Sequence, residues 1–146
     1  MPYRYLRRTG DTKYHYVHNV GAGNKNIFRS ARDFERFIKK IQDYTQTENR
    51  VRIIAYCLTS NSYHLILEEI ELGATAQLIH LLSVSYAMYF YARYKELGHL
   101  FRGPYKESQI ENDDELIKQI STLHAMPLRQ KISPDKYRWS SYTDYL

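Results

Sequence analysis

The stretch VRIIAYCLTSNSYHLILEE, residues 51–69, contains two apolar runs separated by small polar residues. The runs are Val51 to Leu58 and Tyr63 to Glu69, and residues 59–62 join them. Two runs of strand length joined by turn-forming residues predict an antiparallel strand pair. His64 is the second residue of the second run, and no partner for it is obvious from the sequence.

Further strands and helices are predicted on both sides of this pair. Alternation of aromatic and β-branched residues predicts a strand at 14–20, and apolar residues at helical spacing predict a helix at 31–46 with Ser30 as its N-cap. A long helix is predicted at 75–94. The remaining predictions are an edge strand or hairpin arm at 99–106, interrupted by Gly103-Pro104, and a helix from Asn112 or Asp113 to about Ala125, where Pro127 stops it.

The order of these elements is β, α, β, β, α, β, α. It predicts an α+β, ferredoxin-like sandwich, with one antiparallel sheet of four to five strands and helices packed mainly on one face. With 146 residues the chain has the size of one compact domain. A basic and aromatic N-terminal arm is expected at about 1–12, and a C-terminal tail at about 128–146.

The composition is basic and aromatic, because 21 Lys and Arg face 16 Asp and Glu, and the chain has 15 tyrosines. This combination favours nucleic acid, in which cations meet phosphates and rings stack on bases. Arg32, Arg36, Lys39 and Lys40 are interpreted as a solvated helix face. The candidates for phosphate contacts are Arg4, Arg7, Arg8, Arg102, Lys106, Arg129, Lys131 and Arg138.

Cys57 is the only cysteine, which excludes an internal disulfide and a thiolate zinc cage. The first residues lack the apolar core of a signal peptide, and no apolar run reaches the ~20 residues of a membrane helix. A cytoplasmic protein without a membrane partner is therefore expected. Trp139 is interpreted as a packing anchor, and the tyrosines of the second long helix as packing residues.

Six segments follow one another over most of the chain: YHYVHN, IFRSARDFERF, IIAYCLTSNSYHLIL, GHLFRGPYKE, DDELIKQISTLHAMPLRQKI and YRWSSYTDYL. Taken together, they resemble the single-tyrosine HUH transposases, and most of all the REP-associated tyrosine transposases. The resemblance implies a ferredoxin-like fold that binds single-stranded DNA hairpins at transposon ends. It also implies DNA cleavage by two histidines, a metal ion and one tyrosine.

The chain departs from this family at the positions that carry the chemistry. His64 matches the second histidine of the His-x-His pair, but Ser62 stands in place of the first. Thr122 stands where the resemblance places the nucleophilic tyrosine, and an aliphatic hydroxyl is far harder to ionise than a phenol with a pKa near ~10. Met126 replaces a polar residue that assists the metal, and a thioether is a poor ligand for a hard cation.

These departures predict a transposase-derived protein that binds single-stranded or hairpin DNA without cutting it. No cofactor is expected, and Mg or Mn only if residual activity exists. His15 and His18 face opposite sides of a regular strand and therefore share no metal. The alternatives are an active metal-dependent enzyme with non-standard ligands and a regulatory or protein-interaction domain without nucleic-acid binding. Structured RNA as the partner and a homodimer are also left open.

Overall fold

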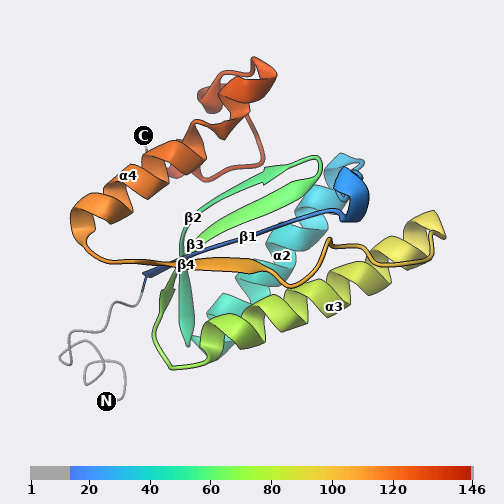
Figure 1. Cartoon of the computed structure of the whole chain (residues 1–146), viewed down its shortest axis with the longest axis horizontal. Coiled ribbons are helices and arrows are strands. Elements are labelled where there is room, and N and C mark those ends of the chain that lie inside the picture. Colours follow the sequence, from blue (N-terminus) through green and yellow to red (C-terminus); the bar gives the residue numbers. More distant parts are fainter. Residues whose placement is uncertain (1–13, 146) are drawn as a thin grey trace.

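A computed structural model describes residues 14–145 of the chain. Strands β1 (Tyr14–Val20), β2 (Val51–Thr59), β3 (Ser62–Glu69) and β4 (Lys106–Ile110) form one antiparallel sheet of four strands in the order β2-β3-β1-β4 (Figure 1). Helix α2 (Ala31–Glu48) links β1 to β2, α3 (Ala74–Tyr94) links β3 to β4, and α4 (Asp113–His124) follows β4. This order is the ferredoxin-like split βαβ arrangement, which confirms the predicted fold class.

The predicted strand pair is the β2–β3 hairpin, whose two-residue turn is Ser60-Asn61. The register places Cys57 opposite His64 on one side of β3, and β1 pairs on the other side with His18 opposite His64. Since side chains alternate along a strand, this register decides which residues of three strands share a face.

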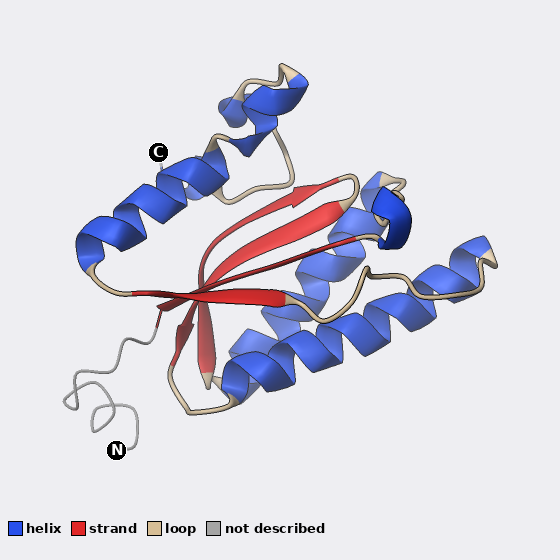
Figure 2. Ribbon diagram, in the orientation of Figure 1, coloured by secondary structure: helices blue, strands red, loops and turns tan. Residues whose placement is uncertain are grey.

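Helices cover both faces of the sheet (Figure 2). On one face, α2 and α3 contribute Phe37, Ile41, Leu78 and Leu82 to a large core cluster with the sheet. On the other face, Leu123 of α4 packs with Ile66 and Ile110 in a smaller cluster. Two of the three long helices thus share a face, as predicted, and the third covers the opposite one.

The caps of the helices agree in part with the sequence prediction. Asn112 is the N-cap of α4, and its side chain accepts a hydrogen bond from the Glu115 N–H at 2.8 Å. Ser30 occupies the N-cap position of α2 but makes no side-chain cap bond. Along α3, Leu78, Ile79 and Leu82 are buried, whereas Leu81 is exposed.

The predicted strand at 99–106 is wrong, because the fourth strand lies further along the chain, at Lys106–Ile110. Between residues 99 and 105 the only strand-like contact is one bridge from Gly21 to Phe101. Proline has no N–H to donate to a ladder, so Pro104 fits a loop better than a paired strand. The loop is held instead by the Asn19 side chain, which donates to the Gly103 carbonyl at 2.9 Å.

The residues after α4 form the short helices η2 (Met126–Gln130), η3 (Pro134–Lys136) and η4 (Tyr142–Tyr145), and part of this segment pairs with the edge of β2. The Leu58 N–H donates to the Trp139 carbonyl at 2.8 Å, and the Ser141 N–H donates to the Tyr56 carbonyl at 2.9 Å. The Trp139 ring stacks on Phe34 at 4.6 Å, as a packing anchor should. No helix within residues 14–145 has the length and hydrophobicity needed to cross a membrane.

Candidate nucleic-acid interface

His64 lies on β3 with its side chain on the face of the sheet that α4 covers. Its neighbours Tyr63 and Leu65 are buried in the core cluster on the opposite face, whereas Ile66 belongs to the cluster under α4. Ser62 and His64 therefore point to the same side, two residues apart. Tyr63 points away from them.

Both ring nitrogens of His64 are hydrogen-bonded. Nδ1 lies 2.7 Å from the Tyr16 hydroxyl, and Nε2 lies 2.9 Å from the Ser62 hydroxyl, with the donor in each case set by the tautomer. Ser62 bonds in turn to the Thr59 hydroxyl. A neutral imidazole has one donor and one acceptor, so these two contacts use its full hydrogen-bonding capacity.

His18 completes a group of three parallel rings, called here the three-ring cluster: Tyr16, His18 and His64. The ring centroids of Tyr16 and His18 are 4.8 Å apart, those of His18 and His64 5.7 Å, and those of Tyr16 and His64 6.1 Å. The angles between the ring planes are at most 20°. Cross-strand pairing produces this stack, because His18 of β1 is the direct partner of His64.

The three-ring cluster is uncharged near neutral pH. The pKa of His64 is lowered to about 4, chiefly by burial and in addition by the neighbouring His18 and the Arg129 guanidinium. Burial and then the charge of Lys106 lower the pKa of His18, whereas burial raises the pKa of Tyr16 against the opposing effect of Arg129. The positive charge beside this cluster therefore belongs to Arg129 of η2 and Lys106 of β4.

The residues around His64 do not fit a divalent metal ion. Ser62 offers only a neutral hydroxyl, and both nitrogens of His64 already have partners. Among residues 14–145, no three His, Cys, Asp or Glu side chains lie close enough together to hold a metal. Hard cations such as Mg²⁺ prefer several oxygen ligands, above all carboxylates, and one neutral hydroxyl beside an imidazole does not supply them.

Thr122 and Met126 are not joined to the three-ring cluster. Thr122 is exposed on α4, and its hydroxyl donates to the carbonyl of Lys118 one turn earlier at 3.0 Å. Met126 packs against the apolar cluster under α4. No hydrogen bond or ring contact within the described residues links either one to His64. Thr122 thus lies on an exposed side of α4, ~100° around the helix from the buried Leu123.

The basic residues predicted to contact phosphate are divided between regions. Arg129 and Lys106 lie close enough to the three-ring cluster to change its pKa values, whereas Arg102 bonds to the Asn24 side chain. Arg138 lies 4.5 Å from the Trp139 ring centroid and 3.4 Å from Glu35. Lys131 is exposed after η2. Arg4, Arg7 and Arg8 lie outside the described residues.

The other histidines on these elements have structural partners. His15 points to the opposite face from His18, with Nδ1 at 2.9 Å from Glu107 and Nε2 at 3.7 Å from Glu69. His124 is buried, and its Nε2 lies 2.8 Å from the Ser141 hydroxyl. Neither belongs to the cluster around His64.

Sequence reasoning missed Tyr16, His18 and Thr59 as neighbours of His64. The alternation of residues 14–20 placed Tyr16 and His18 on one face of a strand, and this was the only local signal. Their position opposite His64 depends on the register between β1 and β3, which no local pattern determines.

Comparison with known proteins shows similarity at the level of the fold. No protein-family model matches the sequence, and no curated protein matches it either. The structure of the REP-associated tyrosine transposase bound to a REP hairpin superposes with a TM-score of 0.65 and 11% identity, covering 90% of this chain and 76% of that one. A presumed transposase from Deinococcus radiodurans R1 has a TM-score of 0.55 and 13% identity, covering 75% of this chain and 85% of that one. The chain therefore has the α+β fold of these two transposase-like structures.

Proposed function

We propose that the chain is a transposase-derived protein that binds single-stranded or hairpin DNA on the α4 face of its sheet and does not cleave it. The observation that carries this proposal is the hydrogen bonding of His64, whose two nitrogens are used by Tyr16 and Ser62. An imidazole held in this way supports the surrounding structure, and its one acceptor nitrogen is already engaged by a hydroxyl group of the protein.

Binding is supported by the charges beside the three-ring cluster. Arg129 and Lys106 are basic residues next to neutral hydroxyl and imidazole groups, which suit contacts to phosphate oxygens and sugars. The transposase-like fold supports the same conclusion, because one protein with this fold is bound to a REP hairpin. A contact set of this kind predicts affinity that falls steeply with salt.

The absence of cleavage is supported by the hydroxyl groups of Thr122 and Tyr16, neither of which is activated as a nucleophile. Thr122 donates to its own helix, and an aliphatic alcohol is a weak nucleophile without a base beside it. Among the described residues, Tyr16 is the tyrosine hydrogen-bonded to His64, but burial raises its pKa while the pKa of His64 is lowered to about 4. Transfer of the phenol proton to this imidazole is therefore strongly unfavourable.

A combined binding and cleavage assay on labelled hairpin oligonucleotides, with and without Mg or Mn, tests the proposal. We expect salt-sensitive binding, no nicking and no covalent adduct on a denaturing gel. Arg129→Ala should weaken binding and Arg129→Lys should largely restore it. Metal-dependent nicking that disappears in Thr122→Ala or in Tyr16→Phe would overturn the proposal in favour of an active enzyme.

The double variant Ser62→His with Thr122→Tyr examines whether only the chemistry has been lost. Nicking by this variant, absent from the wild type, would show that the scaffold still places DNA correctly. If the wild type does not bind hairpins even at low salt, the alternative of a protein-interaction domain is favoured.

A further inference from the structure

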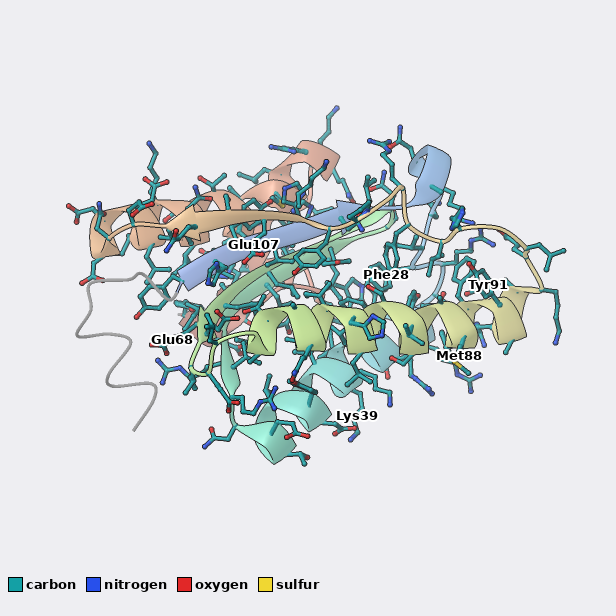
Figure 3. The ribbon with its side chains drawn as sticks, turned by 60° about the horizontal axis from the view of Figure 1, so that its bottom comes forward. Phe28, Lys39, Glu68, Met88, Tyr91 and Glu107 are labelled. Atoms are coloured by element: carbon teal, nitrogen blue, oxygen red, sulfur yellow. The ribbon has the colours of Figure 1, made fainter. Side chains whose placement is uncertain are left out.

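A basic depression lies on the opposite side of the sheet from the three-ring cluster, between α2 and α3. It has a volume of about 510 Å³, and its lining residues are Arg32, Glu35, Arg36, Lys39 and Tyr89. Figure 3 views this helical side of the molecule, with Lys39 labelled on α2 and Met88 on α3. The depression is called the α2–α3 groove below.

The cations of the α2–α3 groove recur along one stripe of α2. Arg32, Arg36 and Lys39 are separated by four and three residues, so they lie on successive turns of one helix face. Lys39 lies 2.6 Å from Asp43, and Glu35 pairs with Arg138 at 3.4 Å. Within residues 14–145, neither Arg32 nor Arg36 has a carboxylate within ion-pair distance. Two exposed guanidinium groups therefore remain available to an anion.

Arg36 is held in place by a ring that is itself fixed. Its guanidinium carbon lies 5.1 Å from the centroid of Tyr89, whose hydroxyl donates to the Asp33 carboxylate at 2.6 Å. Asp33 is fully buried and also accepts hydrogen bonds from the Arg29 N–H at 2.8 Å and from Tyr94. A guanidinium stacked on a ring keeps its edge N–H groups free, and this edge matches the geometry of phosphate.

We propose that the α2–α3 groove is a second phosphate-contacting surface, which binds the backbone of a nucleic acid through Arg32 and Arg36. The inference rests on the proposed function in one respect only, namely that the ligand is a nucleic acid. A protein partner would need an apolar centre to bury. The groove has no aliphatic lining residue, whereas interfaces with nucleic acid are polar and strongly positive.

The position of this surface has a geometric consequence for the ligand. The three-ring cluster lies on the α4 face of the sheet, and the groove lies beyond the other face, so a short straight strand does not reach both. Two segments of one folded nucleic acid, or a strand that bends around the molecule, would satisfy both surfaces.

The test compares Arg32→Ala/Arg36→Ala with the charge-preserving control Arg32→Lys/Arg36→Lys in hairpin-binding titrations over a range of salt concentrations. Each lost phosphate contact lowers the slope of log K against log [salt] by ~0.7 for single strands or ~0.9 for duplex, so the alanine variant should lose roughly 1.4–1.8 in slope. The lysine variant should keep the wild-type slope. Circular dichroism of both variants should show the wild-type fold, because both side chains are exposed.

The outcomes separate this inference from the proposed function. A reduced slope in the alanine variant supports the groove, even if Arg129→Ala has no effect and the α4-face site fails. An unchanged slope, with Arg129→Ala still reducing binding, overturns the groove alone. Absence of any oligonucleotide binding by the wild type overturns both. Poly-glutamate serves as a competing polyanion. If it binds the wild type more tightly than the hairpin does, and if the alanine variant loses this binding, the assignment to nucleic acid is overturned.

Discussion

The two faces of the sheet differ in what they bury. The face under α2 and α3 holds a continuous core that includes Phe28, Phe37, Tyr86 and Phe90, whose rings contact one another. The face under α4 holds only a small apolar cluster, and the three-ring cluster lies beside it. One face therefore contributes most of the hydrophobic stabilisation. The other accommodates polar side chains, whose burial in a purely apolar core would be unfavourable.

Truncation of a large side chain on each face gives the largest expected effect. Phe37 is 1% exposed and contacts the rings of Phe28, Tyr63 and Tyr86, so Phe37→Ala should lower the free energy of unfolding by about 3–5 kcal/mol. Ile120→Ala on α4 should cost less than half as much, because this side chain is only partly buried. Urea denaturation measures both, and equal losses would contradict the difference between the faces.

The second largest expected effect is a loss of stability at acidic pH, which arises from His64 on the α4 face. The pKa of His64 is about 4 in the folded chain, against ~6.5 for an unperturbed histidine, so the folded state resists protonation. This contribution to stability is complete above pH ~6.5 and is lost as the pH falls towards 4, by up to about 3 kcal/mol. Urea denaturation at pH 7 and pH 4.5 should show the loss in the wild type and a smaller loss in His64→Gln.

The α2–α3 side should respond to acid over a lower range of pH. Burial raises the pKa of Asp33, but hydrogen bonds from Tyr89, Tyr94 and the Arg29 N–H outweigh this, so its pKa lies below the usual value. The stability it gives is present above pH ~4 and is lost as the pH falls through the lowered pKa. Asp33→Asn should cost about 1–3 kcal/mol at pH 7 and should remove this dependence on pH. An unchanged midpoint of unfolding at pH 7 would refute the role given to Asp33.

Thr122→Ala should have the smallest effect. The hydroxyl is exposed and bonds only within its own helix, so the change in the free energy of unfolding should stay within about 0.5 kcal/mol. Hairpin affinity should also stay the same. A loss of affinity greater than tenfold would place Thr122 in the DNA-binding surface. Thr122 would then no longer differ from Arg129, which is expected to contact DNA.

The fold was predictable because its signals are local. The alternation in β1, the two runs around Ser60-Asn61 and the helical spacing in α2 and α4 each lie within one element. The strand at 99–106 was misplaced because aromatic residues there resemble a strand, whereas the position of β4 depends on its pairing with β1. His64 was singled out by its place in the second apolar run, and Ser62 by the resemblance to the transposases.

The neighbours of these residues were not predictable, because they come from distant parts of the chain. His18 reaches His64 through strand register, and Arg129 approaches His64 and Tyr16 through the path of the chain after α4. The interpretation of the α2 cations as a solvated face agrees with the exposure of Arg32, Arg36 and Lys39, but it did not include their neighbour on α3. The ring that holds Arg36 belongs to α3, and only the packing of α2 on α3 brings the two together.

The pairing of residues 139–141 with β2 affects the order of folding. All four strands precede this segment in the sequence, so during synthesis the hydrogen-bonding groups on the outer edge of β2 stay uncovered until it emerges. Such edges recruit strands from other chains, which leads to aggregation. The segment that follows α4 thus covers the outer edge of β2 only after its own synthesis, and it does so independently of any ligand.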